Sequence, residues 1–365
     1  MTNREREIYQ LLRENPMISQ KEIADLLGIQ RSSVAVHILN LTKKGVVKGK
    51  GYILSEGDYV LVIGGSNVDI TGFPKSVLRL EDSNPGAVKM SLGGVGRNIG
   101  ENLARLDIST KMMTAIGKDV YGQKIIEESR RIDLDMSQAL VLENASTSIY
   151  LSIMDEEGDM KLALSDMDIA ERIDTDYINK NAKLIRNASV VVVDANLNQS
   201  VLEYLFSNFK DVDFFVDTVS AAKSLKLKNL LGYVHTLKPN RIETEALTGI
   251  KVENEADAHK AIDVFLEQGV KQVFVSLGQE GVVYGSADHR EKFQPKPIKM
   301  INATGAGDAF MAALVYSWIN EYDPKKTLAF ASCASALAIS CEATINPELS
   351  EAKVNAMMAD VYGIK

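Results

Sequence analysis

The sequence predicts an α/β domain with a largely parallel sheet and a small antiparallel side sheet, preceded by a small helical domain. From residue 59 onward, short runs rich in Val, Ile and Phe alternate with helical segments, which is the pattern of an α/β domain. Residues 1–57 have helical patterns instead, and they carry nine Lys and Arg against six Asp and Glu. The remainder carries 32 against 43, within a net charge of −8. This change in pattern and charge predicts two domains, 1–56 and 57–365.

The N-terminal domain is predicted to hold three helices. Residues 4–14 have apolar residues at helical spacing. Ser19 followed by Glu22 forms a capping-box pattern that begins a short helix, and Gly28 ends it. A third helix begins near Arg31 and has an apolar face made of Val34, Val36, Ile38, Leu39 and Leu41.

This order of helices, with a glycine in the turn, is that of a helix-turn-helix unit. Residues 45–54, GVVKGKGYIL, alternate around two glycines and predict a hairpin or wing. Residues 1–56 resemble the winged helix-turn-helix DNA-binding domain of bacterial regulators. The resemblance implies that the third helix enters the major groove and that a homodimer binds two half-sites. The residues it places at the DNA are Gln30, Arg31, Ser32, Ser33 and His37, with Lys48 and Lys50 of the wing. Because the positive charge is modest, a three-helix dimerisation module stays the alternative.

The composition argues against several other classes. The longest apolar runs, at 191–195 and 313–319, are too short to span a bilayer, and the charged N-terminus has no signal-peptide core. The two cysteines, Cys333 and Cys341, lie eight residues apart in a helical stretch, and the chain has four His. These features argue against a disulfide framework and a zinc site. We therefore expect a cytoplasmic protein with no membrane partner.

The second domain is predicted to form one main sheet and one side sheet. Six apolar runs predict strands, at residues 59–69, 111–117, 189–196, 213–219, 233–240 and 272–278. Their near-continuous apolar character fits a sheet that is covered on both faces. Residues 146–166 alternate around a DEEGD turn and predict an antiparallel hairpin. Residues 70–92 have no helical period and can supply its partner strands.

Ligands in such folds bind beyond the carboxyl ends of the parallel strands. The residues at those ends are small or polar: Asn67, Asp69, Gly117, Asn196, Asp217, Asn240, Ser276 and Gly278. A further motif, NATGAGDAFMAA at 302–313, places two glycines before an apolar helix. Either this is a turn in which Asp308 caps the helix, or the glycines aim N–H groups at an anion bound near the helix N-terminus.

Several motifs, taken in order, resemble the ribokinase-like, or PfkB, carbohydrate kinases. They are SLGGVGRNIGENLARL (91–106), KPNRIE (238–243), SLGQEG (276–281) and NATGAGDAFMAALV (302–315). The resemblance covers about residues 59–350 and implies a ribokinase-like, mostly parallel sheet with helices on both faces. It also implies a small β-lid from about 70–92 and 146–166. The segments DSNPG (82–86), GGVGRN (93–98), VDTVS (216–220) and TLKPNRIE (236–243) most resemble family members that phosphorylate pseudouridine.

The resemblance assigns phosphoryl transfer to the glycine-rich motif. Asp308 would accept the proton of a sugar 5′-hydroxyl, while Gly305, Ala306 and Gly307 would present N–H groups to the transferred phosphoryl group. Asp69 and Asn98 would hold the ribose hydroxyls, because a carboxylate accepts from two hydroxyls at once. Further candidates for substrate contact are Asn67, Asn84, Gly93, Gly94, Thr147 and Tyr150. Asp69 and Asn84 have turn roles as their alternatives.

The resemblance also implies an ATP site and a metal. Asn240 and Glu243 would organise Mg²⁺ through its waters, although the same spacing fits a helix capping box. Ser276, Gly278, Gly281 and Ser332 would line the ATP side, although small residues near 332 are as easily explained by helix packing. Carbonyls near 301–303 and 340–346 could hold a monovalent cation such as K⁺.

These inferences predict an ATP- and Mg²⁺-dependent kinase that phosphorylates the 5′-hydroxyl of a nucleoside, with pseudouridine as the expected substrate. Another nucleoside or a ribose-type sugar is the alternative within this class. Because residues 1–56 resemble a regulator, a transcription factor that uses the kinase fold only to sense a nucleoside or sugar is the alternative of a different class.

Overall fold

The structure, a computed structural model, describes residues 1–14, 18–47, 58–296, 298–302 and 304–363. It divides into two compact units, Met1–Gly57 and Asp58–Lys365. Among the described residues, no helix is both long and apolar enough to cross a membrane.

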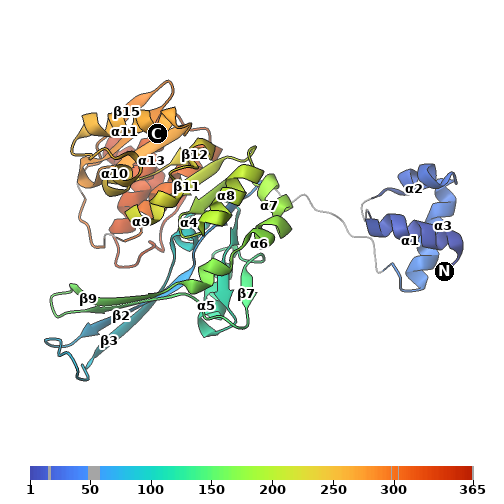
Figure 1. Ribbon diagram of the computed structural model, residues 1–365, viewed down its shortest axis with the longest axis horizontal. Helices are drawn as coiled ribbons and strands as arrows, with labels where there is room; N and C mark the ends of the chain where they lie inside the picture. Colours follow the sequence, from blue (N-terminus) through green and yellow to red (C-terminus); the bar gives the residue numbers. More distant parts are fainter. Residues whose placement is uncertain (15–17, 48–57, 297, 303, 364–365) are drawn as a thin grey trace. The chain divides into compact units, whose positions relative to one another are not determined.

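The first unit contains three helices, α1 (Asn3–Glu14), α2 (Gln20–Leu27) and α3 (Arg31–Lys43) (Figure 1). Both halves of the capping box between Ser19 and Glu22 form, and Gly28 ends α2 with a φ of 63°. The core consists of Ile8, Ile23, Ala24, Val34 and Leu41.

The predicted apolar face of α3 includes two residues that the structure leaves exposed. Val36 and Leu39 are 56% and 54% exposed, because only the side of α3 that carries Val34 and Leu41 packs on the other two helices. Most of the predicted wing, with Lys48 and Lys50, lies outside the described residues.

The second unit is built on a nine-stranded sheet of order β15-β14-β13-β12-β11-β10-β1-β4-β6. Its strands are β1 (Val60–Ile63), β4 (Thr110–Met113), β6 (Leu134–Asp135), β10 (Val190–Asp194), β11 (Phe214–Asp217), β12 (Val234–Leu237), β13 (Gln272–Ser276), β14 (Val282–Ser286) and β15 (Arg290–Phe293). The pairs from β6 to β13 are parallel, and β14 and β15 continue the sheet in antiparallel pairs.

The predicted strand 111–117 is divided in the structure. Its first part is β4, whereas β5 (Ala115–Gly117) leaves the main sheet and pairs with β7 (Leu140–Leu142). Thr114 separates the two strands, so these seven residues contribute to two sheets rather than one.

Helices cover both faces of the main sheet. One apolar core lies under α6 (Thr175–Lys180), α7 (Ala182–Asn187), α8 (Gln199–Asn208), α9 (Ala221–Ser224), α10 (Arg241–Thr248) and α11 (Glu255–Glu267). The other lies under α4 (Val95–Arg105), α5 (Val120–Arg131), α12 (Ala306–Ile319), α13 (Pro324–Ile339) and α14 (Glu351–Tyr362). Short 3₁₀ turns lie at Asp168–Arg172, Leu225–Leu227, Leu231–Tyr233 and Gly278–Glu280.

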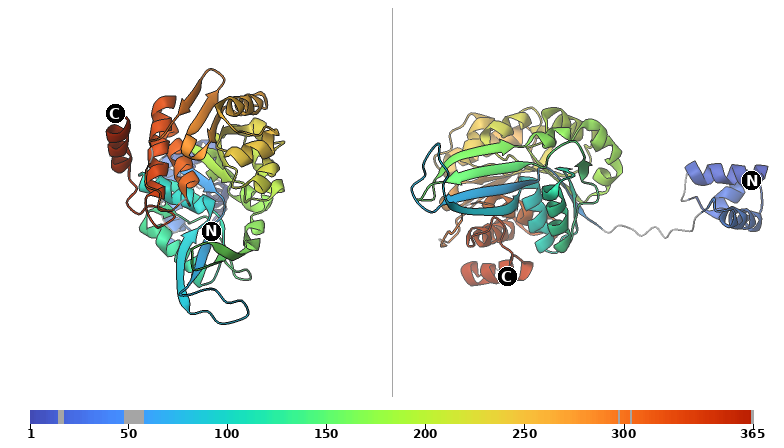
Figure 2. Two further views of the ribbon diagram at one scale, coloured as in Figure 1. Left: turned by 90° about the vertical axis from the view of Figure 1, so that its left-hand side faces the viewer. Right: turned by 90° about the horizontal axis from the view of Figure 1, so that it is seen from below.

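The predicted side sheet is present and projects from the second unit as a curved arm (Figures 1 and 2). Its strands are β2 (Asn67–Pro74), β3 (Gly86–Gly93), β8 (Ile149–Met154) and β9 (Met160–Asp166), in the order β3-β2-β8-β9. We call this sheet the lid. Asp69 pairs with Ser91 and Tyr150 on one face, and Ile70 pairs with Met90 and Leu151 on the other. The lid therefore has one polar and one apolar face.

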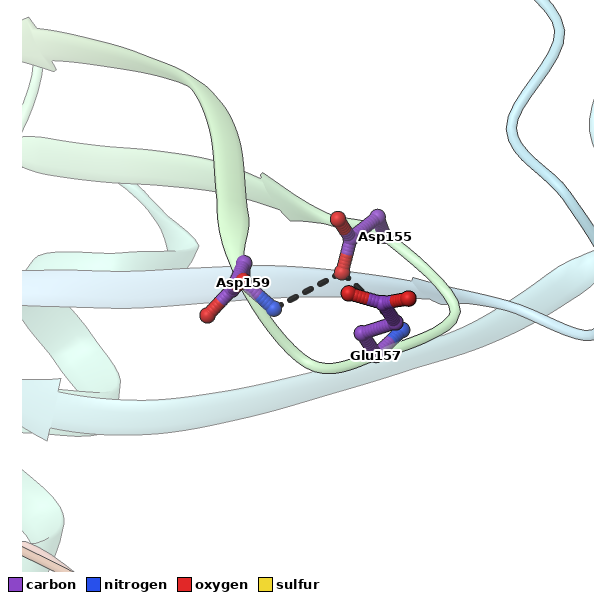
Figure 3. A group of neighbouring side chains, drawn as sticks. All are labelled: Asp155, Glu157 and Asp159. Carbon is purple, nitrogen blue, oxygen red and sulfur yellow. Dashed lines mark hydrogen bonds between the residues drawn. The ribbon is translucent and has the colours of Figure 1, made fainter.

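The turn between β8 and β9 is held by Asp155 (Figure 3). Its Oδ1 accepts the N–H groups of Glu157 and Asp159 at 3.0 and 2.8 Å, and its Oδ2 lies 2.8 Å from Lys161 Nζ. Bonding to Lys161 holds the pKa of Asp155 below its ordinary value. The acidic sequence of this turn is thus explained by turn geometry.

Candidate active site

The candidate site lies where the carboxyl ends of the parallel strands meet the N-terminus of α12. Asp194 and Asp217 are the last residues of β10 and β11, and Asn240 follows β12. Asp308 lies in the first turn of α12, where a Cβ built on its neighbour Gly307 would lie 3.2 Å from Lys238 Nζ, and Lys238 lies 3.2 Å from Asp217. This is the end of an open α/β sheet at which ligands bind.

The N-terminus of α12 is open. Gly305 precedes the helix with a φ of 82°, and a Cβ there would lie 2.1 Å from the carbonyl oxygen of Thr344, so glycine is required. No side chain of the described residues caps this helix. The first N–H groups of a helix have no intrahelical acceptor, so those of Ala306 and Gly307 are free to bind an anion.

Asp308 does not cap α12. It is the third residue of the helix, and its Oδ2 accepts a hydrogen bond from Asn98 Nδ2 at 2.8 Å. Burial and the nearby charge of Asp217 raise the pKa of Asp308 to about 7, against the opposing effects of Asn98 and Lys238. A carboxyl group with this pKa can accept a proton near neutral pH.

The predicted role of Asp308 as the base in phosphoryl transfer implies a pH dependence. Because only the charged carboxylate would act as the base, kcat/KM is expected to rise about tenfold per pH unit below pH 7 and to level off above it. The charged neighbours that face Asp308 are Asp217, Asp194 and Lys238. Initial rates between pH 5 and 9 measure the profile, and a flat profile across pH 6–8 would contradict a titrating base.

The predicted sugar-binding residues form two pairs. Asn67 Nδ2 donates to Asp69 Oδ1 at 2.6 Å, while Asn98 bonds to Asp308. Burial raises the pKa of Asp69, and the hydrogen bond from Asn67 opposes this. A Cβ on Gly93 would lie 2.2 Å from the Asp69 carboxylate. Gly93 therefore makes room for the Asp69 side chain itself.

Glycine is required at position 94 for a different structural reason. Its φ is 97°, and a Cβ would lie 2.4 Å from the carbonyl oxygen of Gly65. The sequence expectation was that Gly93 and Gly94 open space for the sugar ring. In the structure, Asp69 and the backbone of Gly65 occupy the directions in which their side chains would point.

Two predicted substrate contacts have other partners. Thr147 is fully buried; its hydroxyl donates to Asp119 Oδ1 at 2.7 Å and accepts the Gly117 N–H at 2.9 Å. These bonds join Thr147, just before β8, to the loop between β5 and α5, so its hydroxyl already has two partners within the protein. Asn84 closes the loop between β2 and β3 through hydrogen bonds with the backbone of Arg79 and Asp82.

A cavity of about 720 Å³ opens beside the N-terminus of α12. The predicted residues that line it are Asn240, Ser276, Gly278, Gly281, Ser332, Ala306 and Gly307. Ser332 is buried, and its hydroxyl has no hydrogen-bond partner in the described part of the chain. Phe310, Met300 and Ile339 add apolar surface. A small mixed cavity of this size suits a nucleotide.

Asn240 and Glu243 form the capping box of α10, as the spacing allows. Glu243 is 5% exposed, and its Oε2 accepts the Thr218 hydroxyl at 2.6 Å and the Asn240 N–H at 2.9 Å. Its Oε1 accepts no hydrogen bond from the residues described. This oxygen fits a metal-bound water, because Mg²⁺ keeps several waters and uses few carboxylates.

Two buried charged residues were given no role by the sequence. Asp194 accepts the N–H groups of Gly65 and Gly96 at 2.8 Å each, which ties the loop after β1 to α4. Lys238 follows β12 and lies 3.2 Å from Asp217. The only feature of the sequence that could have pointed to Asp194 and Lys238 is that each is a charged residue at the carboxyl end of a buried strand.

This arrangement defines a class of enzyme. The site combines four features: a parallel α/β sheet, a β-lid, a nucleotide-sized cavity and a carboxylate of raised pKa at an open helix N-terminus. Together they are the features of a sugar or nucleoside kinase. Residues 58–352 match the pfkB family of carbohydrate kinases, and the chain belongs to that family. Residues 1–48 match the winged helix-turn-helix DNA-binding family. The predicted family and ribokinase-like fold are confirmed.

Related proteins extend over most of the chain. A sugar kinase of Escherichia coli K12, named YeiI and described as uncharacterized, is 40% identical and covers 96% of this chain and 97% of its own. The pseudouridine kinase of the same organism is 38% identical and covers 82% and 96%. A Clostridium perfringens protein of known structure is 39% identical, with a TM-score of 0.78 and coverage of 84% and 96%.

Proposed function

We propose that this protein transfers the terminal phosphoryl group of ATP to the 5′-hydroxyl of pseudouridine. The observation that supports this reaction is the environment of Asp308. Its carboxyl group has a pKa of about 7 and lies beside the uncapped N-terminus of α12. The choice of nucleoside is supported by the 38% identity to a pseudouridine kinase over 82% of this chain.

In this reaction, Asp308 takes the proton of the acceptor hydroxyl, which then attacks the terminal phosphorus of ATP. The N–H groups of Ala306 and Gly307 stabilise the charge of the phosphoryl oxygens. Asn98 orients the Asp308 carboxylate. Glu243 and Asn240 would hold Mg²⁺ through water, and Mg²⁺ neutralises charge on the phosphate oxygens when bound. The lid excludes water, which would otherwise compete with the nucleoside as acceptor.

Asp69 is proposed to bind ribose hydroxyls from the polar face of the lid. Its Oδ1 is held by Asn67, so the carboxylate is oriented before substrate arrives. Nothing in this pair distinguishes one riboside from another, and relatives include a guanosine-inosine kinase and a ribokinase, at 25% and 27% identity. Another nucleoside or ribose is therefore the alternative substrate.

Turnover of ATP with pseudouridine, uridine, inosine, guanosine and ribose tests the substrate. We expect pseudouridine to have the highest kcat/KM. Asp69→Asn should lower kcat/KM for every riboside by about 10- to 100-fold, as expected from losing hydrogen bonds to a charged group. Asp360→Asn, an exposed change on α14, is the matched control. Higher kcat/KM with any other acceptor would reject pseudouridine and leave the kinase reaction standing.

A monovalent cation is part of the proposal. Asn302 Nδ2 donates to the carbonyl oxygen of Glu342 at 3.1 Å, which joins the two segments whose carbonyls would hold the ion; Ala303 lies outside the described residues. Replacing KCl with tetramethylammonium chloride in the same assay tests for it.

We propose a second function, DNA binding by the first unit, in a homodimer. The match of residues 1–48 to a DNA-binding family supports it, as does the exposure of Gln30, Arg31, Ser32 and Ser33 at the start of α3. His37 is less exposed. A dimer fits paired half-sites, and the exposed apolar side chains Val88, Met90, Leu162 and Leu164 on the lid offer a surface for a second copy.

Gel-shift titration of the full chain, with DNA from upstream of its own gene, tests this function. Affinity should fall steeply between 50 and 200 mM salt, and Arg31→Ala should weaken binding about tenfold. Lys251→Met, a charge change on the surface of the second unit, is the control. Light scattering of the same samples gives the oligomeric state. Equal binding of a random duplex would reject a sequence-specific regulator.

A further inference from the structure

Lys238 is a buried cation at the centre of the candidate site. It follows β12 and precedes the N-cap of α10, and it is only 7% exposed. It lines the 720 Å³ cavity together with Ala306 and Gly307. A Cβ built on Gly307 would lie 3.2 Å from Lys238 Nζ, so the ammonium group lies against the first turn of α12.

The surroundings of Lys238 keep it charged. Burial alone would lower its pKa, but Asp217, Glu243 and Asp308 raise it above the ordinary value. In the described part of the chain, Asp217 is the only carboxylate within ion-pair distance, with Oδ2 at 3.2 Å from Nζ. An ammonium group has three N–H donors, so donors remain for a ligand in the cavity.

A buried ion pair is weak support for stability, because removing both charges from water costs about as much as their attraction returns. Asp217 is itself fixed, since its Oδ1 accepts the N–H of Val219 at 2.9 Å. Val219 has a φ of 63°, a rare value for a β-branched residue, and strain of this kind is concentrated at functional sites. The weak contribution of the ion pair to stability, the fixed position of Asp217 and the strained backbone beside it all fit a lysine that is positioned to bind a ligand.

We propose that Lys238 is a catalytic residue whose Nζ binds the phosphoryl group as it passes from ATP to the acceptor, and that Asp217 positions it. This inference rests on the proposed kinase reaction. In that step the bond from the terminal phosphorus to the bridging oxygen breaks and the bond to the acceptor oxygen forms. The acceptor proton goes to Asp308 and ADP leaves. Lys238 donates hydrogen bonds to the phosphoryl oxygens throughout and keeps its proton.

The test separates this role from simple neutralisation of Asp217. Lys238→Met, Asp217→Asn and the double variant are compared with wild type for kcat and for the affinities of ADP and AMPPNP. The double variant removes both charges, so it leaves no unpaired buried carboxylate and keeps the comparison open if Lys238→Met folds poorly. Lys251→Met is the control for loss of a lysine charge.

We expect kcat to fall at least 100-fold in Lys238→Met and to stay low in the double variant. Wild type should bind AMPPNP more tightly than ADP, and Lys238→Met should lose that preference. Turnover within threefold of wild type in Lys238→Met, or recovered turnover in the double variant, would overturn the role. The nucleotide affinities need no acceptor, so they test Lys238 even if pseudouridine is the wrong substrate.

Discussion

Asp308→Asn is expected to lower kcat by about 10²- to 10⁴-fold while nucleoside binding is retained, as expected for loss of a general base. Asparagine has the same shape and still accepts the hydrogen bond from Asn98, which measures 2.8 Å in the structure. It cannot take the acceptor proton. Steady-state kinetics and calorimetric titration of the nucleoside measure the two effects separately.

The same substitution should stabilise the protein above neutral pH. The pKa of Asp308 is raised from 3.8 to about 7, so between these values the folded chain binds a proton that the unfolded chain has lost. Stability from this group is therefore lost as pH rises through that window. Asp308→Asn removes the effect, and its Tm should exceed that of wild type at pH 8 but not at pH 4.

Asp360→Asn, on the exposed surface of α14, is the control for both readouts. Unchanged turnover in Asp308→Asn would rule out the general-base role. A lowered Tm at pH 8 would show that Asp308 is a structural residue and would contradict the stability effect expected from its raised pKa.

Gly305→Ala should reduce turnover by about 10²- to 10³-fold, the loss expected when an N–H group that stabilises a transition state is displaced. The added Cβ would lie 2.1 Å from the Thr344 carbonyl oxygen, so the backbone before α12 must move. The φ of 82° adds strain for any side chain. The N–H groups of Ala306 and Gly307 would then no longer point at the phosphoryl group.

Gly249→Ala is a matched control for this change. Gly249 ends α10 with a φ of 75°, and a Cβ there meets nothing within 4 Å. It therefore has the backbone strain without the collision. Thermal unfolding and kcat of both variants are compared. Equal stability loss together with equal turnover would show that the geometry before α12 has no catalytic part.

The order of elements could be predicted from the sequence because it depends on local patterns. The apolar runs that became β1, β10, β11, β12 and β13 alternate with helical segments, and this alone predicts a parallel sheet. The capping boxes at Ser19 and Asn240 depend on residues three apart, and both form. The division of residues 111–117 at Thr114 was missed, because its cause is the pairing of β5 with the distant β7.

The candidate site was predictable only in part. The family motifs pointed to Asp308 and Asn98, and the end of a predicted strand pointed to Asp69, but neither showed which side chain bonds to which. Thr147 was predicted as a substrate contact, because the spacing of residues in the lid cannot show that its hydroxyl donates a hydrogen bond to Asp119. Lys238 stood inside a quoted motif without a role, since a lysine at a strand end is usually exposed.

The sequence by itself determined the two-part organisation, the α/β pattern and the identity of the glycine-rich motif, because each depends on residues that are close together in the sequence. Only the tertiary structure decided the charge state of the site. Asp308, Asp217 and Lys238 come from three separate segments of the chain, and the pKa values of Asp308 and Lys238 depend on distances and burial that exist only when the sheet has assembled. Electrostatic coupling depends on the distances between groups in the folded protein, and the order of residues in the sequence does not give those distances.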